Sequence, residues 1–365
     1  MRIAQPSQPL TGMWSRVPVE PPGSVMLGVS FRPLQAAALG LDPGTVLAEL
    51  LTYPFAVLHL AAYWNELEPA AGRFEPGGLD DQIAAAAAAG KKVIVGVGAV
   101  KAFGYPEFFV PAHHLPAPLP EGTLISPDSH PRLLAAATEY VTRVVGRYRD
   151  RPEVIGWQVE HEPADPLGLE HSWRLSESFA AREVAAVRAA DPARPVIVSG
   201  FVPTSAPVRL QQRWRTRDQG DSLAVAGRLA DVVGLNLYPR HALVRLGPRT
   251  AYLAGADSRW QRRANARLVA GLVTRGRRLM VTEGQAEPWE TMTTPPSPAG
   301  RGMFSCLPEH VIGNYNAAMR LGAAAPDGLW AYLFWGAEYW LKRRDQGDDS
   351  YLSAFGRVLA AARAT

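Results

Sequence analysis

The chain has very little cysteine and no long apolar run. Cys306 is the single cysteine among 365 residues, so neither an internal disulfide nor a zinc site of several thiolates can form. No run of about 18 or more apolar residues offers a membrane-spanning helix. The first ten residues also lack the apolar core of a signal peptide. We therefore expect a cytoplasmic protein without membrane association, unless a signal has been trimmed from the sequence.

Two further features are missing. The eight histidines show no metal-ligand spacing, which predicts no metal site. The first predicted strand, residues 25–31, is not followed by the glycine-rich phosphate turn of an open dinucleotide-binding sheet. Gly96 and Gly98 leave a later strand, but no third glycine follows at the required spacing. We expect neither a metal nor an organic cofactor.

The charge is positive but dispersed. A net charge of +4 would permit nucleic-acid binding, yet the basic residues are mostly arginines scattered between acidic ones. We interpret the basic stretch 259–263 as the solvated face of a helix. Hydrophobic residues make up 47% of the chain, which is enough to bury a large core. No nucleic-acid partner is expected.

Eight apolar or β-branched runs alternate with amphipathic stretches. The predicted strands are 25–31, 56–61, 92–97, 154–159, 195–199, 232–237, 279–282 and 329–334. The predicted helices are 43–51, 79–89, 131–148, 176–190, 259–274, 309–321 and 352–362. Near-continuous apolar strands between helices are typical of a parallel sheet that is buried on both faces. Eight repeats predict an α/β fold, a single (β/α)8 TIM barrel spanning 23–365 after an extended arm, 1–22. Proline-rich stretches at 111–120 and 295–298 predict long βα loops.

Carboxylates follow the fourth and seventh predicted strands. Residues 157–163 read WQVEHEP and residues 281–289 read VTEGQAEPW. Reactive groups of such barrels project from the C-terminal strand ends into one bowl, so we expect Glu162 and Glu283 to face each other. Paired carboxylates suit glycosidic cleavage, because one can protonate the leaving oxygen while the other attacks the anomeric carbon.

These motifs resemble glycoside hydrolase clan A, which includes the cellulase-like family 5, over roughly the whole barrel. Its members usually end strand four in Asn-Glu-Pro and strand seven in Thr-Glu, so the resemblance implies that Glu162 is the acid/base and Glu283 the nucleophile. WNELEPAAGRF at 64–74, LNLYP at 235–239 and FWG at 334–336 also match. By resemblance, Tyr238 hydrogen-bonds the nucleophile and Trp335 forms the floor under the sugar.

The chain departs from this pattern at one position. His161 stands where the clan has the asparagine that donates to the sugar 2-hydroxyl. A neutral histidine can also donate from one ring nitrogen, so His161 is a predicted substrate contact. The alternative is a histidine that only supports the strand end.

Other residues at strand ends have two interpretations each. Arg32 is interpreted either as a site residue that contacts the nucleophile or an acidic substrate, or as a structural residue. Glu287 and Trp289 bind a sugar or pack their loop. Trp64 stacks on a sugar or belongs to the loop core. The same choice applies to the other aromatic residues that follow strands, namely Tyr105, Trp335, Tyr339 and Trp340.

Nearby carboxylates are predicted to be structural. Glu160 alternates away from Glu162, so we expect it to face the helix layer in a polar pair. Glu66 and Glu68 are expected to tie down the loop after the second strand.

The predicted function is retaining hydrolysis of a β-glycosidic bond in an oligosaccharide or glycoside, through a covalent intermediate. Such enzymes hold their carboxyl groups about 5–5.5 Å apart. One alternative is a carbohydrate-binding barrel with weak or no activity, which the histidine at 161 would favour. A metal-dependent barrel hydrolase normally carries His or Asp ligands at several strand ends, whereas only His59 and His161 lie near strands. The motifs specify neither the sugar and linkage, nor endo or exo action, nor the oligomeric state.

Overall fold

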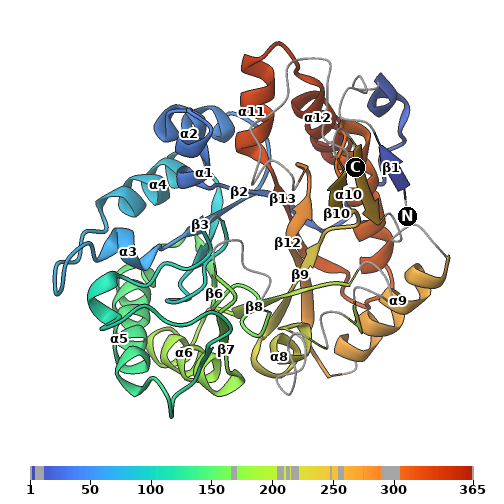
Figure 1. Ribbon diagram of the computed structural model, residues 1–365. Coiled ribbons are helices and arrows are strands. Elements are labelled where there is room, and N and C mark those ends of the chain that lie inside the picture. The colour runs from blue at the N-terminus through green and yellow to red at the C-terminus, as the bar shows by residue number, and fades with distance from the viewer. Residues whose placement is uncertain are drawn as a thin grey trace. The chain divides into compact units, whose positions relative to one another are not determined.

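The computed structural model in Figure 1 shows a closed eight-stranded barrel with helices between the strands, as predicted. The structure describes residues 2–4, 12–104, 106–165, 171–203, 209–210, 214, 222–246, 249–253, 259–273, 275–288 and 305–363. The strands pair in the order β12-β13-β2-β3-β4-β6-β8-β9.

All eight predicted strands are present in the barrel. They are β2 (Met26–Ser30), β3 (Val57–Ala61), β4 (Lys92–Gly96), β6 (Val154–Gln158), β8 (Val196–Phe201), β9 (Val232–Leu237), β12 (Arg278–Gln285) and β13 (Leu329–Trp335). Their interiors are almost wholly buried; every residue of β3, for example, is buried. This burial on both faces is the reason that the sequence shows continuous apolar runs instead of strict alternation.

All seven predicted helices are also present. They are α2 (Pro43–Leu51), α4 (Gly77–Ala88), α5 (Pro131–Tyr148), α6 (Glu177–Ala190), α9 (Arg259–Val273), α10 (Pro308–Gly322) and α12 (Ser350–Arg363). Their starts carry recognisable signals. Asp42 caps α2 and Ser176 caps α6, each accepting a hydrogen bond from a backbone N–H of the first turn. Proline opens α2, α5 and α10, where its missing N–H costs nothing.

The shorter elements were not predicted. They are α1 (Pro33–Ala38), α3 (Trp64–Leu67), α8 (Ser222–Leu229), α11 (Ala337–Asp345), the 3-10 turns η1 (Gly12–Arg16) and η2 (Ala112–His114), and five short strands. Those strands are β1 (Arg2–Ala4), β5 (Leu124–Ile125), β7 (Arg174–Leu175), β10 (His241–Leu246) and β11 (Arg249–Leu253). Strands β5 and β7 pair in parallel, and β1, β11 and β10 form an antiparallel sheet.

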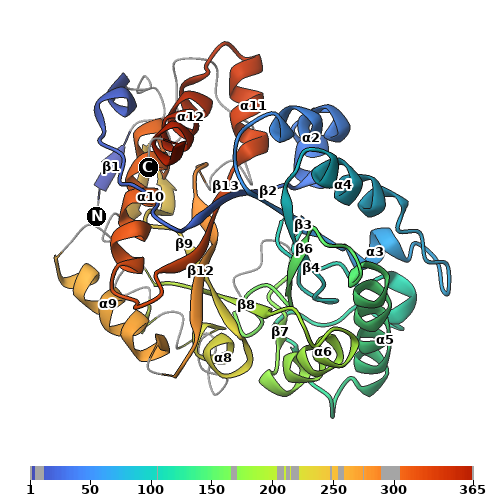
Figure 2. The ribbon, with the colours of Figure 1, turned by 180° about the vertical axis from the view of Figure 1, so that it is seen from behind.

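The chain divides into two compact units. Unit 1 comprises Met1–Val57, Val202–Arg209 and Leu235–Thr365, and unit 2 comprises Leu58–Phe201 and Leu210–Gly234. Within unit 2, α5 packs against α6, α6 against α8, and α8 against β8; Figure 2 shows α5 beside α6. Within unit 1, α10 packs against β12 and α12.

The segment before β2 is fastened to α10 of the same unit. Glu20 N donates to Asn316 Oδ1 at 2.9 Å, and Asn316 Nδ2 donates to the Pro18 carbonyl at 2.7 Å. The Tyr315 hydroxyl donates to the Glu20 carbonyl at 2.9 Å. This part of the predicted arm therefore packs on the helix through backbone and side-chain hydrogen bonds.

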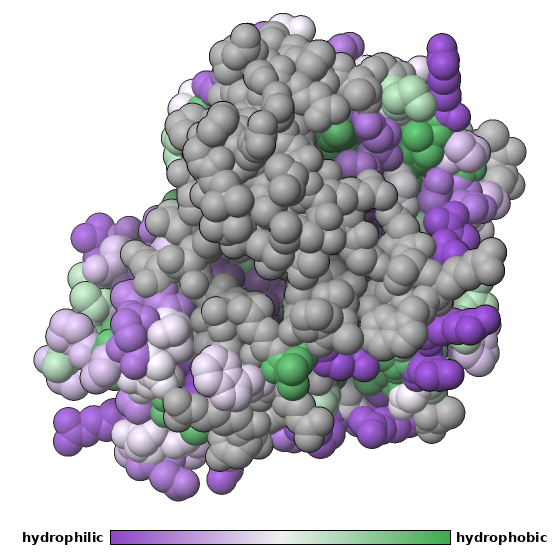
Figure 3. Space-filling view, turned by 45° about the vertical axis from the view of Figure 1, so that its right-hand side comes forward, coloured by the Kyte–Doolittle hydropathy of each residue, from purple (hydrophilic) through white to green (hydrophobic). Residues whose placement is uncertain are grey.

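The described residues on one face of the molecule are mostly polar (Figure 3). On the face in Figure 3 the coloured residues are mainly hydrophilic, with scattered hydrophobic ones. Arg262 and Arg263 are exposed on α9, as expected for a solvated helix face. In the part of the chain that the structure describes, no helix combines the length and the apolarity needed to cross a bilayer.

Candidate active site

Glu162 lies in a turn with unusual backbone geometry. Strand β6 ends at Gln158, and Glu160 and Glu162 then adopt φ angles of 55° and 45°. Residues other than glycine rarely adopt this left-handed conformation, which costs roughly 1–3 kcal/mol and is concentrated at functional sites. Because the chain has left the strand, simple alternation does not determine the direction of Glu160, contrary to the sequence-based reasoning.

A buried lysine holds this turn. Lys101 is 2% exposed, and its Nζ donates to the carbonyl oxygens of Glu162 at 3.0 Å and Asp165 at 2.9 Å. The Glu162 N–H donates to Ser199 Oγ at 3.4 Å. The Glu162 side chain keeps 12% of its surface exposed. These hydrogen bonds hold the backbone of Glu162 in place. The Glu162 carboxyl group itself remains partly exposed, so a substrate can reach it.

Glu160 forms the polar pair that the sequence predicts. Its carboxylate accepts hydrogen bonds from Val100 N at 2.9 Å and Lys101 N at 2.6 Å, and it bonds with Glu183 of α6. The Ala99 N–H donates to Glu183 Oε1 at 3.2 Å. Burial raises the pKa of both carboxyls, and the charge of Glu160 raises that of Glu183 further. Both shifts favour the protonated forms of these carboxyls.

Gly98 has a packing role beside this pair. A Cβ atom on Gly98 would lie 2.2 Å from Glu160 N and 2.6 Å from its Cα. No side chain fits at such a separation. The glycine after β4 therefore permits close packing of two loops, which accounts for it without a phosphate-binding turn.

His161 is buried and neutral. Burial, followed by the charges of Lys101 and His59, lowers the pKa of His161 well below its usual value. Its Nε2 lies 4.0 Å from Glu162 Oε1, and its backbone N–H donates to the Lys101 carbonyl at 2.9 Å. A neutral imidazole beside Glu162 is the form that can donate one hydrogen bond to a substrate hydroxyl.

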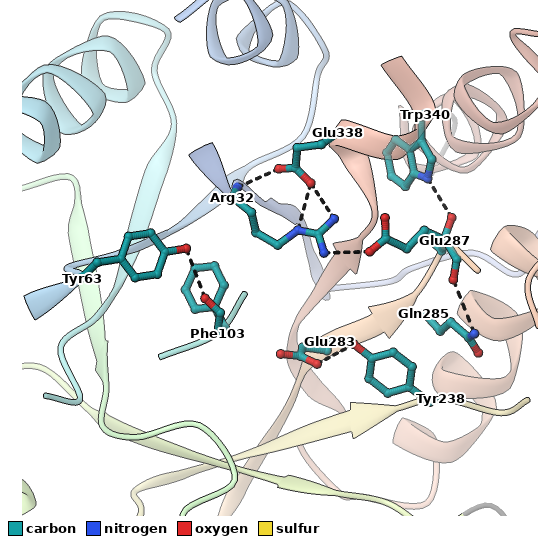
Figure 4. Close-up of polar contacts among 10 residues, drawn as sticks. Arg32, Tyr63, Phe103, Tyr238, Glu283, Gln285, Glu287, Glu338 and Trp340 are labelled. Atoms are coloured by element: carbon teal, nitrogen blue, oxygen red, sulfur yellow. Dashed lines mark hydrogen bonds and ion pairs between the residues drawn. The ribbon is translucent and has the colours of Figure 1, made fainter. Parts of the chain in front are cut away.

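Glu283 lies at an irregularity in β12. Val281 pairs with Tyr332 and Gly284 with Phe334, so three steps along β12 correspond to two along β13. Such a bulge re-aims a side chain and is common beside active sites. The Tyr238 hydroxyl, just after β9, donates to Glu283 Oε2 at 2.6 Å, the contact that the resemblance implies (Figure 4).

The neighbouring side chains support this arrangement. Thr282 Oγ1 donates to Asn236 Oδ1 at 2.6 Å, which links β12 to the end of β9. Burial and the charge of Glu283 raise the pKa of Tyr238 well above its usual value. The phenol therefore stays protonated and serves as a donor to the carboxylate.

Arg32 binds two carboxylates other than Glu283. Its guanidinium donates to Glu287 Oε1 at 2.7 Å and to Glu338 Oε2 at 2.6 and 2.9 Å, and all three side chains are at most 1% exposed (Figure 4). Burial alone would lower the pKa of Arg32, but the two carboxylates outweigh it and raise the pKa. The guanidinium also lies 4.3 Å from the ring centroid of Trp335.

Other residues of unit 1 that have two interpretations lie in or beside this ion-paired cluster. Glu287 uses its Oε1 atom for Arg32, and Trp335 is only 2% exposed beside the Arg32 guanidinium. Trp340 lies fully buried in α11 and donates to the Ala286 carbonyl at 2.7 Å. Glu338 was not among the site residues predicted from the sequence. Its position three residues after the end of β13 could have indicated a place near the site. Trp289 lies outside the described residues, as does Tyr105.

Trp64 is buried at the start of α3, the short helix in the connection that follows β3. Its ring lies 5.2 Å from that of Tyr140 and 4.6 Å from that of His114. Its Nε1 donates to Glu68 Oε2 at 2.8 Å. The structure thus places Trp64 in the loop core, and Glu68 ties the loop down as predicted, whereas Glu66 is exposed.

The fold is that of the clan A glycoside hydrolases, with one glutamate after β6 and one near the C-terminal end of β12. The family model Glyco_hydro_42, described as beta-galactosidase, matches residues 54–183. Glu162 lies within that match and Glu283 beyond it. No protein among the curated ones matches the chain.

Solved structures of clan A proteins share the fold. The GH5_18 protein of Streptomyces cattleya, in complex with GlcNAc, is 18% identical over 93% of this chain and 80% of its own, with a TM-score of 0.58. A GH10 endoxylanase from a sugarcane soil metagenome is 14% identical over 93% and 97%, with a TM-score of 0.55. Xylanase 10B of Thermotoga maritima is 12% identical over 92% and 95%, also at 0.55.

Proposed function

We propose that the protein is a retaining glycoside hydrolase that cleaves a β-glycosidic bond, with Glu162 as acid/base and Glu283 as nucleophile. The proposal rests on the surroundings of Glu283. This residue lies at a bulge of β12 and accepts a 2.6 Å hydrogen bond from the Tyr238 hydroxyl. A donor that stays protonated stabilises the charged form of a carboxylate, and a nucleophile must be charged.

In the first step, Glu283 attacks the anomeric carbon while Glu162 transfers its proton to the glycosidic oxygen. The bond to the leaving group breaks, and a glycosyl ester forms on Glu283. In the second step, Glu162 takes a proton from water, whose oxygen attacks the anomeric carbon and releases Glu283. Two inversions retain the configuration of the sugar.

The environment of Glu162 suits a group that changes protonation state during the cycle. The charge on Glu283 favours the protonated acid before the first step, and the ester removes that charge before the second. His161 contributes no positive charge beside Glu162, because the low pKa of this buried imidazole keeps it neutral.

The substrate class is an oligosaccharide or simple glycoside. The beta-galactosidase family match and the GlcNAc complex of the Streptomyces protein support β-linked hexosides as the first compounds to assay. A panel of chromogenic aryl β-glycosides, including galactoside, glucoside, xyloside and N-acetylglucosaminide, tests both activity and sugar preference.

Two variants test the roles. Glu283→Ala should abolish turnover of every substrate, and azide should not restore it with retained configuration. Glu162→Ala should spare aryl glycosides with good leaving groups, which need little protonation, and azide should accelerate it to give a product of retained configuration. Near-normal rates for Glu283→Ala would show that the nucleophile is misassigned.

A second candidate is a carbohydrate-binding barrel without hydrolysis, which the presence of His161 in place of asparagine favours. Saturable binding of a glycoside by calorimetry, with no aglycone release from any member of the panel, would support this alternative. Release of the aglycone, lost in Glu283→Ala, would reject it.

A further inference from the structure

One cluster of possible metal ligands lies outside the proposed catalytic residues. It comprises Glu68, just after α3, and the histidine pair His113 and His114 that ends η2, all within unit 2. The carboxylate oxygens and imidazole nitrogens lie within 4.8 Å of one another. Glu68 and His113 are separated by 45 positions, so two different loops bring these groups together.

The distances in the cluster are long for direct hydrogen bonds and compatible with ligand atoms of one metal ion. Glu68 Oε1 lies 3.3 Å from His113 Nε2, and Glu68 Oε2 lies 3.4 Å from His114 Nε2. Hydrogen bonds from N–H to oxygen are usually about 2.7–3.2 Å long. Ligands at zinc bond lengths of about 2.0–2.2 Å are separated by roughly 3.3–3.5 Å along the edges of a tetrahedron.

The donor set selects the kind of ion. Two imidazole nitrogens with one carboxylate match zinc sites that keep a fourth position for water. Calcium and magnesium instead prefer oxygen ligands alone. His113 is exposed, whereas His114 and Glu68 are partly buried, so the open side of the cluster faces solvent.

The ligands are held in place by their neighbours. Trp64 Nε1 donates to Glu68 Oε2 at 2.8 Å, and the Gly72 N–H donates to Glu68 Oε1 at 3.2 Å. The His114 ring lies 4.6 Å from the Trp64 ring at an angle of 31°. Hydrogen bonds to a ligating carboxylate orient it and contribute to metal affinity.

We propose that Glu68, His113 and His114 bind one Zn²⁺ ion, with water as the fourth ligand. The ion joins the loop after β3 to the loop after β4, and it stabilises the folded chain because the unfolded chain does not hold the three ligands together. This site was not predicted from the sequence, because two adjacent histidines far from the glutamate match no metal-ligand spacing.

Zinc titration of the chelator-treated full chain tests the proposal. Calorimetry should give one Zn²⁺ per chain, and zinc should raise the melting temperature of the chelator-treated protein. Glu68→Gln, His113→Ala and His114→Ala should each weaken zinc binding by more than about tenfold. Glu68→Gln keeps an oxygen for the Trp64 N–H, so its effect separates ligation from packing.

His171→Ala is the matched control. His171 pairs with Glu121 at 2.8 Å in the same unit, a single histidine with a single carboxylate. Zinc binding and the zinc-dependent rise in melting temperature should be unchanged in this variant. Absence of stoichiometric zinc binding would overturn the proposal, as would weak binding that Glu68→Gln leaves unaltered. Neither readout depends on glycoside turnover, so this site and the catalytic assignment can fail separately.

Discussion

Tyr238 and Glu283 are joined by a 2.6 Å hydrogen bond in which the phenol is the donor. The bond connects the residue after β9 to the bulge of β12, and its donor keeps its proton because burial and the charge of Glu283 raise the pKa of Tyr238 well above its usual value. Tyr238 is therefore a positioning residue that orients the carboxylate and stabilises its charge.

Removing this donor should slow catalysis and change its pH dependence. A hydrogen bond to a charged group contributes about 1.5–3 kcal/mol, so Tyr238→Phe should lower kcat/KM roughly tenfold to a hundredfold. The acidic limb of the pH profile should move to higher pH, because the carboxylate loses a group that favours its charged form. Tyr315→Phe, whose hydroxyl bonds only the Glu20 carbonyl among the described contacts, should leave both parameters unchanged. An unshifted acidic limb in Tyr238→Phe would contradict the proposed role.

The buried ion pairs of Arg32 should matter for stability. Arg32→Met leaves Glu287 and Glu338 without a counter-charge and should lower the free energy of unfolding by about 3–5 kcal/mol in urea titrations. Arg320→Met breaks an exposed 2.9 Å pair with Glu20 in the same unit and should cost at most about 1 kcal/mol. Equal losses in the two variants would mean that burial does not govern the contribution of these pairs.

The Glu160–Glu183 pair should make stability fall as pH rises. Both carboxyls have raised pKa values in the folded chain, so the folded state holds more protons than the unfolded state above the usual glutamate value of about 4.3. By linkage, stability is then fully present below that value and is lost as pH rises through the raised folded values.

Glu183→Gln tests this linkage. The amide can donate permanently to Glu160 and still accept from the Ala99 N–H, so the variant should be at least as stable as the parent at alkaline pH, with a flatter pH dependence. The exposed Glu139→Gln serves as the control and should follow the parent curve. Urea unfolding between about pH 5 and 9 measures the difference; parallel curves for the parent and Glu183→Gln would show that the pair carries no shared proton.

The sequence predicted the barrel well because its physical signals are local. A strand that is buried on both faces must be apolar at nearly every position, and all eight barrel strands carry that pattern. Long helices such as α5 carry amphipathic periodicity and proline or capping residues at their starts. Helix α3 has only four residues and α11 contains mostly buried aromatic and charged side chains, so neither shows a usable period.

The contacts that shape the site are not local, which is why they were not predicted. Arg32 forms its ion pair with Glu338 at a separation of 306 residues, and no pattern in either segment predicts that the two will pair. The left-handed backbone conformation of Glu160 and Glu162 could not be predicted from the sequence either, because glutamate is not among the residues that favour this conformation in turns. The order of strands predicted the positions of Glu162 and Glu283, whereas their detailed surroundings follow from contacts between distant segments.

His161 is the residue at which this chain departs from the clan pattern, and the structure makes its role testable. The imidazole is buried, neutral and 4.0 Å from Glu162 Oε1. If it donates to the sugar 2-hydroxyl in the transition state, His161→Ala should lower kcat/KM for a normal glycoside by roughly a hundredfold.

The matching 2-deoxy glycoside separates substrate binding from structural support. That compound has no hydroxyl for His161 to bind, so His161→Ala should slow its hydrolysis far less than that of the parent sugar. His161→Asn should recover part of the activity toward the normal sugar, because an amide donates from a similar place. The loss should also be constant across neutral pH, because the low pKa of His161 keeps the imidazole neutral throughout that range. Equal losses on the two substrates would instead show that His161 acts by holding the turn, where its backbone N–H bonds the Lys101 carbonyl.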